Sequence, residues 1–162
     1  MIIISDTSPI TSLLAVNHIH LLKDMYGLVT IPQGVRQELL RVESRRTEIE
    51  NLLSEGWLQV KPIIDQELFK KIFADLDQGE SEAITLGLEL RADLILIDET
   101  KGRRMAKSYG LQVTGLVGVL MEAKSKKLIL SVKELLDELI EKAGFYVKQD
   151  LYNSVLKAAG EY

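Results

Sequence analysis

Two aspartates follow apolar runs that have the character of β-strands. Asp6 comes directly after Ile2–Ser5, and Asp98 comes directly after Leu94–Ile97. In an open parallel sheet, ligands bind beyond the carboxyl ends of the strands, so both carboxylates are expected at the same edge of the sheet. Either aspartate alone is explained equally well as a helix cap or a turn residue. The two together favour a functional site.

Two glutamates fall on helix faces where a surface glutamate is unusual. With about 100° between successive residues, Glu38 lies between Val35 and Val42 in an apolar arc. Glu82 lies at the margin of the apolar arc of its own helix. Glu80, by contrast, is explained as a capping residue. Glu38 and Glu82 are therefore expected to face inward, and Glu80 is not.

Inward-facing carboxylates need a partner, because charged groups are almost never buried unpaired. Two carboxylates about 5–6 Å apart repel each other by roughly 3 kcal/mol at an effective dielectric near 20. Either protons or a hard divalent cation must offset that repulsion, and the chain has no cysteine to supply a thiolate. Oxygen-only ligands favour Mg²⁺, Mn²⁺ or Ca²⁺. The sequence predicts a metal site formed by Asp6, Glu38, Glu82 and Asp98.

The elements that must position these acids alternate between strand-like and helix-like patterns from end to end. This alternation predicts an α/β fold with a mostly parallel sheet, in a single domain spanning residues 1–162. The expected strands are rich in Ile, Leu and Val, as strands covered on both faces are. They are Ile2–Ser5, Leu28–Ile31, Asp93–Ile97 and Gln112–Thr114, with Trp57–Val60 and Phe145–Val147 as weaker edge-strand candidates.

Several helix starts carry capping chemistry. The candidate caps are Ser8 before Pro9, Asp77 with Glu80, and Ser131 with Glu134. A charged helical pattern covers Arg41–Ser54, with room for a break, and a last helix is expected over Gln149–Ala159.

Composition limits the classes of function. The 162 residues are 46% hydrophobic and 27% charged, the balance of one ordinary globular domain. A formal net charge of −4 makes the whole molecule a poor electrostatic match for nucleic acid, so RNA binding would need a local basic patch. The first apolar run is too short for a signal peptide or membrane span, and the absence of cysteine fits a reducing compartment. We therefore expect a cytoplasmic protein.

The motifs resemble those of a known family. They are Ile4-Ser-Asp-Thr-Ser-Pro9, Ile31-Pro32 followed by Val35-Arg-Gln-Glu-Leu39, Gly79-Glu-Ser-Glu-Ala-Ile84 and Ala92-Asp-Leu-Ile-Leu-Ile-Asp98. Their order and spacing resemble PIN-domain proteins over nearly the whole chain, and the branch of prokaryotic PIN-like proteins related to VapC toxins in particular. Toxin relatives more often carry Asp at the third acidic position, where this chain has Glu82.

The resemblance implies a three-layer PIN-like fold and a metal-dependent endoribonuclease that uses Mg²⁺ or Mn²⁺. The family's acids match Asp6, Glu38, Glu82 and Asp98. PIN proteins commonly carry a further acid close behind the fourth, and Glu99 is the candidate for it. Thr7 would orient Asp6. RNA phosphates would contact the basic residues after Asp98, namely Lys101, Arg103, Arg104 and Lys107. The resemblance also implies a small antitoxin partner and a homodimer. The alternative is a catalytically weak PIN-like module that binds RNA or a partner protein.

Overall fold

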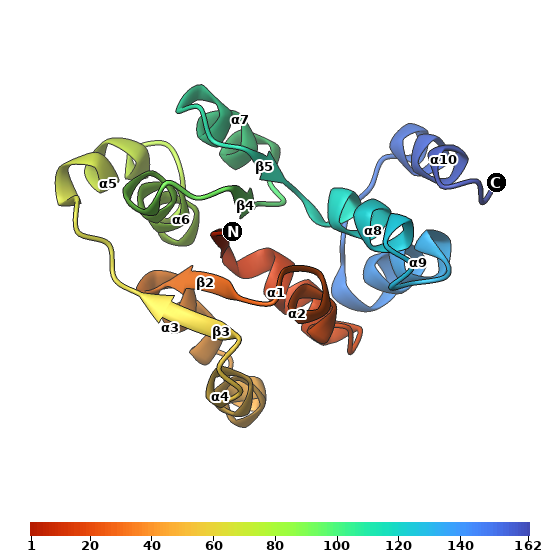
Figure 1. Ribbon diagram of the computed structural model, residues 1–162, viewed down its shortest axis with the longest axis horizontal. Coiled ribbons are helices and arrows are strands. Elements are labelled where there is room, and N and C mark those ends of the chain that lie inside the picture. The colour runs from red at the N-terminus through yellow and green to blue at the C-terminus, as the bar shows by residue number, and fades with distance from the viewer.

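Five short parallel strands form the centre of the structure, a computed structural model that describes all residues 1–162 (Figure 1). They lie in the order β3-β2-β1-β4-β5, so the first strand is in the middle. This all-parallel arrangement confirms the expected α/β class. The strands are β1 (Ile3–Ser5), β2 (Val29–Pro32), β3 (Leu58–Lys61), β4 (Leu94–Leu96) and β5 (Val113–Thr114).

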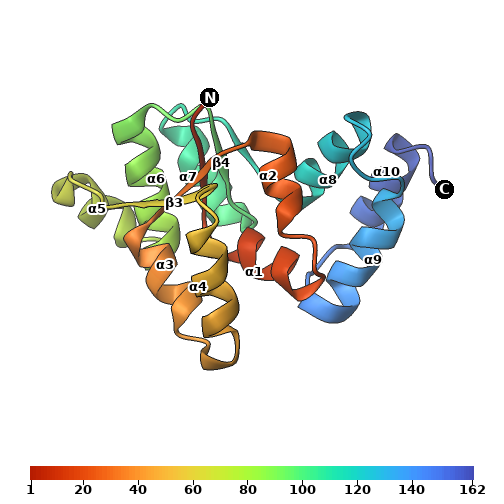
Figure 2. The same cartoon turned by 60° about the horizontal axis from the view of Figure 1, so that its bottom comes forward.

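Ten α-helices and one 3-10 turn, η1, connect and cover these strands (Figures 1 and 2). In chain order they are α1 (Thr7–Ala15), α2 (His20–Tyr26), α3 (Gln33–Leu40), η1 (Glu43–Arg45), α4 (Arg46–Ser54), α5 (Gln66–Phe73), α6 (Gln78–Leu90), α7 (Thr100–Ser108), α8 (Leu116–Ser125), α9 (Val132–Ala143) and α10 (Gln149–Ala158).

The two faces of the sheet have separate hydrophobic cores. Successive side chains of a strand point to opposite faces, and Ile3 belongs to the larger core while Ile4 belongs to the smaller one. Helices α1 to α4 and α8 to α10 contribute buried residues to the larger core, and α5 to α7 pack on the other face. The result is the three-layer arrangement that the sequence predicted.

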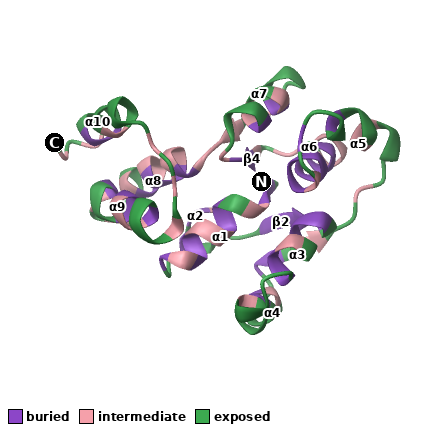
Figure 3. Cartoon of the chain, turned by 180° about the vertical axis from the view of Figure 1, so that it is seen from behind, coloured by how far each residue is buried: buried purple, intermediate pink, exposed green.

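Helix α6 is buried on nearly all sides. Every residue from Gly79 to Gly87 is buried, whereas α10 is mostly exposed (Figure 3). Helix α6 contacts α3, α5 and the strands β1, β2 and β4. An acid in the first turns of this helix is therefore enclosed wherever it points around the helix.

The order of the strands reverses between β1 and β4. The chain first adds β2 and β3 on one side of β1, then crosses back to place β4 and β5 on the other side. Ser5 pairs with Leu96, and the amide of Asp6 donates a hydrogen bond to the Leu96 carbonyl at 3.0 Å. In open α/β sheets such a switch point is where ligands bind. Asp6 and Asp98 thus lie at the carboxyl ends of neighbouring strands, as predicted.

Some local expectations were wrong. Phe145–Val147 is not a strand, because its alternating pattern comes from packing on the larger core without a neighbouring strand. Ser8 does not cap the first helix, which begins one residue earlier, at Thr7. The helix expected at Arg41–Ser54 begins only at Arg46, after η1. Val42 lies beyond α3 and is exposed, so it forms no part of the arc assigned to Glu38.

Other local expectations were confirmed. The edge strand β3 overlaps the expected Trp57–Val60 with a shift of one residue, and the last helix matches α10 to within one residue. The Asp77 and Ser131 side chains accept hydrogen bonds from the amides three residues later, at Glu80 and Glu134. No helix is long and apolar enough to cross a membrane.

Candidate acidic site at the switch point of the sheet

Asp6 lies at the centre of the carboxyl edge, between the end of β1 and the start of α1. It occupies the N-cap position of α1, yet its side chain makes no capping hydrogen bond. The residue is 5% exposed. Burial raises the pKa of the Asp6 carboxyl to about 8, and nearby acidic side chains push it in the same direction. A helix-capping role therefore does not explain Asp6, and its carboxylate is costly to ionise in place.

Glu38 comes from α3 and meets Asp6 beside Gly79 in the first turn of α6. A Cβ placed on Gly79 would lie 2.9 Å from Oδ1 of Asp6 and 2.9 Å from both carboxylate oxygens of Glu38. The Gly79 amide donates to Glu38 Oε1 at 3.1 Å, and the Thr7 hydroxyl donates to Oε2. The structure thus brings Asp6 and Glu38 together, and the absence of a side chain at Gly79 leaves the room for them. The Thr7 hydroxyl therefore orients Glu38 and not Asp6, contrary to expectation.

Glu82 makes the reciprocal contact in the opposite direction, from α6 to the first turn of α3. Its Oε1 accepts from the Gly34 amide at 3.1 Å, and its Oε2 accepts from Gln78 Nε2 at 2.9 Å. Helix α3 has no side-chain cap of its own at Pro32, so Glu82 satisfies an amide that would otherwise lack an acceptor. Helices α3 and α6 lie side by side (Figure 2). Glu82 is buried as expected, but Gly34 and Gln78 already engage its two oxygens.

Glu80 is a buried acid that was expected from the sequence to be only a capping residue. It is 3% exposed, and its Oε2 has no hydrogen-bond partner. A Cβ on Gly102 of α7 would lie 2.5 Å from that oxygen. Burial first, and then the charges of Asp77 and Glu99, raise the Glu80 pKa to about 7.

The burial of the Glu80 side chain was not predicted, for a physical reason. The capping pattern correctly identified Asp77 as the acceptor for the Glu80 amide, but it says nothing about the Glu80 side chain. A helical wheel cannot show that the Glu80 side chain is buried either, because α6 is buried on all sides there. The signal available in the sequence was the close spacing of two glutamates, Glu80 and Glu82, in one glycine-containing turn.

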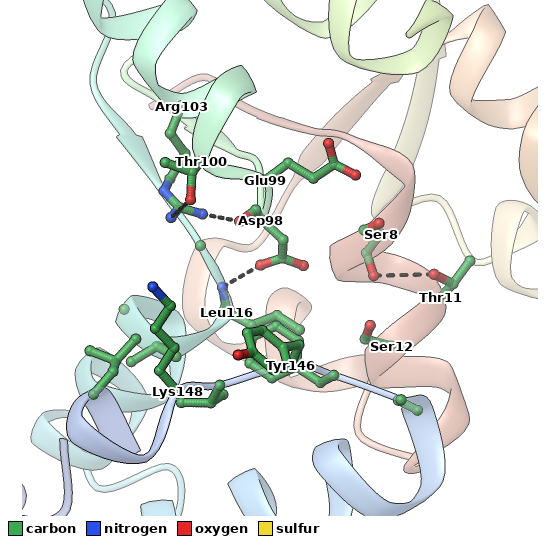
Figure 4. Close-up of a pocket in the computed structure, with 18 of the residues that line it drawn as sticks. Ser8, Thr11, Ser12, Asp98, Glu99, Thr100, Arg103, Leu116, Tyr146 and Lys148 are labelled. Carbon is green, nitrogen blue, oxygen red and sulfur yellow. Dashed lines mark hydrogen bonds between the residues drawn. The ribbon is translucent and has the colours of Figure 1, made fainter. Parts of the chain in front are cut away.

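Asp98 lies at the end of β4 and is partly buried (Figure 4). Its Oδ1 accepts from the Leu116 amide at the start of α8 at 2.7 Å, while its Oδ2 has no partner. Burial raises the pKa of the Asp98 carboxyl, with the Leu116 amide and the Arg103 charge opposing the rise. Asp98 therefore shares with Glu80 a buried oxygen that no group of the protein satisfies.

The basic residues after Asp98 divide into two kinds. The Arg103 guanidinium donates to the backbone carbonyl of Asp98 and, at 3.4 Å, to that of Ile97. It holds the turn between β4 and α7. Lys101, Arg104 and Lys107 are exposed and form no ion pair within the chain. Only the second kind is free to contact a phosphate.

The acids fit a hard divalent cation in their chemistry, although no three of them stand as a ready-made metal cluster. All donors are carboxylate oxygens, the ligands that Mg²⁺ and Mn²⁺ prefer. Glu80 and Asp98 each hold one buried oxygen without a partner, and Asp6 carries no capping bond. Glu38 and Glu82, by contrast, use both oxygens in hydrogen bonds. Holding an ion would require these side chains to turn toward one another.

Comparison with known proteins gives one family. A sequence model described as PIN domain matches residues 2–161, and none of the curated proteins compared matches the chain. PIN domains are generally nucleases and typically use divalent metals, which agrees with acids gathered at the switch point of the sheet. Because the match spans almost every residue of a fold that has the expected three layers, the chain belongs to the PIN-domain family.

Proposed function

We propose that this protein is a divalent-metal-dependent endoribonuclease that hydrolyses RNA phosphodiester bonds at the carboxyl edge of its sheet. One observation carries the proposal: near the switch point, two buried acids from different elements each hold an oxygen that nothing in the chain satisfies, and a third acid, Asp6, is buried close by. Asp98 and Glu80 each have one such oxygen, and Asp6 is buried without a capping role. Natural proteins rarely leave buried polar atoms unpaired, so such atoms call for a ligand.

Within this proposal, Asp6, Glu80 and Asp98 hold the ion, Mg²⁺ or Mn²⁺. Glu38 supports Asp6, because Thr7 and the Gly79 amide hold its carboxylate against the same glycine. A bound ion would supply an activated water and would stabilise the charge that develops on the phosphate oxygens. Glu82 is a positioning residue, since it fixes the start of α3 and hence the place of Glu38 one turn later.

RNA phosphates away from the ion are assigned to Lys101 and Arg104, which are exposed and unpaired. Arg103 shapes the turn beside Asp98 and contributes its charge from there. A cytoplasmic location, a small antitoxin that covers the acidic edge, and a homodimer belong to the same proposal through the likeness to VapC-type toxins.

The test is cleavage of defined RNAs by the purified chain after removal of bound metal. Single-stranded and structured RNAs are incubated with Mg²⁺, with Mn²⁺ or with chelator, and Asp6→Asn is carried in parallel so that a contaminating nuclease is recognised. Metal-dependent cleavage by the wild type and none by Asp6→Asn is expected. Binding of RNA without cleavage under every metal condition would instead establish the alternative, a catalytically weak PIN-like module.

A further inference from the structure

A groove of about 990 Å³ opens beside Asp98, and no residue of α6 lines it (Figure 4). The first turn of α7 forms one wall with Thr100 and Lys101, and α1 forms another with the hydroxyls of Ser8 and Ser12. The segment between α9 and α10 closes the third side. The groove thus leads from the protein surface to the candidate metal-holding carboxylate of Asp98.

The segment between α9 and α10 presents an aromatic ring to this groove. Gly144 ends α9 in a left-handed conformation, with φ +67°, and reverses the chain. In the extended stretch that follows, Phe145 and Val147 pack on the larger core, while Tyr146 points outward and is 79% exposed. Its hydroxyl makes no hydrogen bond within the chain, and its ring pairs with no other aromatic ring. Two anchored neighbours therefore hold an unused ring at the rim of the groove.

Two lysines at the groove are also unused. Lys101 and Lys148 are exposed and form no ion pair. By contrast, the lysines of the adjacent α8 and α9, and the one directly after α8, each pair with an acid of the chain: Lys124, Lys133, Lys142 and Lys126. A free ring, free cations and hydroxyls around one hollow match the parts of a nucleotide: a base, a phosphate and a sugar. An apolar protein segment would not use the charges.

We propose that this groove is a nucleotide subsite, in which one base of the RNA stacks on Tyr146 while Lys101 and Lys148 neutralise the adjoining phosphate. Aromatic side chains serve this purpose because every base has a π-face, and the interaction is tolerant of sequence. The subsite rests on the proposed function, since it places the backbone of a bound strand next to Asp98. It adds a residue, Tyr146, that selects for an unstacked base.

The experiment measures binding of a short fluorescent single-stranded RNA by anisotropy, in an Asp6→Asn background that prevents cleavage. Tyr146→Ala is expected to weaken binding about 5- to 150-fold, the range that corresponds to about 1–3 kcal/mol of base stacking. Tyr146→Phe keeps the ring and is expected to bind like the parent. Tyr162→Ala removes an equally exposed tyrosine outside the groove and serves as the matched control.

A series of RNAs with one base removed at each position in turn makes the test specific. In the parent, loss of the stacked base should weaken binding at one position, and in Tyr146→Ala the same loss should cost nothing, because the partner ring is already gone. Lys148→Ala should reduce the salt dependence of binding, whereas Tyr146→Ala should leave it unchanged. An equal cost of base removal in both proteins would overturn the subsite.

The outcomes also separate this inference from the proposed function. Unaltered RNA binding by Tyr146→Ala, in a protein whose wild type cleaves RNA, overturns the subsite alone. A wild type that neither binds nor cleaves any RNA overturns both. If Tyr146→Ala changes the sedimentation of the protein and not its RNA affinity, the ring belongs to a protein contact and the subsite is wrong.

Discussion

Glu80 and Glu82 lie two residues apart on α6, and both are almost fully buried, with 3% and 6% exposed. Their surroundings differ. Glu82 faces α3, where a backbone amide and a glutamine side chain engage both of its oxygens. Glu80 faces α7, where one oxygen has no partner. Burial of an acid therefore does not by itself identify a functional group, and the satisfaction of its oxygens separates a structural carboxylate from one that awaits a ligand.

The same division runs across the whole carboxyl edge. Glu38 and Glu82 tie α3 and α6 together, each accepting from a glycine amide in the first turn of the other helix. Asp6, Glu80 and Asp98 have pKa values raised by burial, to about 8 for Asp6 and about 7 for Glu80. Near neutral pH, Asp6 and Glu80 are therefore neutralised either by protons or by a cation. The protonation of these buried acids therefore depends on whether an ion is bound.

The largest expected effect is a difference in RNA cleavage between Glu80→Gln and Glu82→Gln. Glutamine keeps the size of each side chain and removes its negative charge. Glu80→Gln should lower kcat by more than about 100-fold, beyond the 10- to 100-fold loss typical of residues that only orient ligands, whereas Glu82→Gln should stay within that range. Initial rates with saturating Mn²⁺ measure both.

Circular dichroism of the two variants provides the control, because Glu82→Gln retains an oxygen for the Gly34 amide and both variants should fold. Equal losses of kcat in the two folded variants would show that satisfied and unsatisfied acids do not differ in function.

The next effect concerns stability against pH in the absence of metal. The folded-state pKa of Asp6 is raised from 3.8 to about 8, so the folded protein holds a proton that the unfolded chain has lost. This stabilisation is complete below about pH 4 and is lost as pH rises toward 8. One pKa unit corresponds to about 1.4 kcal/mol, so the free energy of unfolding should fall by about 2 kcal/mol or more between pH 5 and pH 8. Urea unfolding in chelator measures it.

Asp6→Asn should reduce that slope most clearly between pH 7 and pH 8, above the Glu80 pKa of about 7, and Asp24→Asn, an exposed aspartate on α2, should leave the slope unchanged. Glu161 acts in another window, because its lowered pKa of about 2 affects stability only in more acidic solution. Added Mn²⁺ should stabilise the wild type most at pH 8, where the acids are ionised. A wild type equally stable at pH 5 and pH 8 would show that Asp6 is not held in the costly environment described.

The fold could be predicted from the sequence because its signals are local. Strands such as Leu94–Leu96 are short apolar runs, and the alternation of elements along the chain is enough to indicate a parallel sheet. The place of Asp6 and Asp98 follows from the same pattern, since each terminates a strand. Phe145–Val147 was misassigned because an alternating pattern records which side chains pack on a core, and not whether a neighbouring strand is present.

The environment of each acid could not be predicted in the same way. Whether Glu80 or Glu82 has a free oxygen depends on what stands opposite, Gly102 on α7 or Gly34 on α3, and these contacts join residues far apart in the sequence. Hydrophobic periodicity identifies the one buried face of a helix. Because α6 is buried all round from Gly79 to Gly87, periodicity cannot separate its buried side chains from exposed ones. The role of Arg103 was hidden for a related reason, because its partners are backbone carbonyls, which carry no sequence signal.

A smaller effect is expected from two glycine substitutions, one that displaces Asp6 and Glu38 and one that displaces Glu82. In Gly79→Ala the added Cβ meets Asp6 and Glu38 at 2.9 Å, and in Gly34→Ala it meets Glu82 at 2.1 Å. Overpacking costs about 1–3 kcal/mol, and the higher helix propensity of alanine returns about 1 kcal/mol. Each variant should therefore lose up to about 2 kcal/mol of unfolding free energy, measured by thermal unfolding.

Cleavage should distinguish the two glycine variants. Gly79→Ala displaces Asp6 and Glu38 together and should lose most of its activity, while Gly34→Ala displaces only Glu82 and should keep more. The reverse order of activities would assign the working carboxylate to Glu82.

The smallest effect separates the two arginines that follow Asp98. Arg104 is exposed and forms no ion pair, so Arg104→Ala should leave stability within about 0.5 kcal/mol of wild type. If Arg104 contacts one RNA phosphate, its loss releases one fewer counterion on binding, and the slope of log affinity against log salt should become shallower by about one. Arg103→Ala should instead lower stability by about 1 kcal/mol, because it removes hydrogen bonds to the Ile97 and Asp98 carbonyls. RNA binding at several salt concentrations, measured beside thermal unfolding, resolves the two. An unchanged salt slope in Arg104→Ala would place this arginine on the ordinary solvated surface and leave the phosphate contacts to Lys101 and Lys148 at the groove.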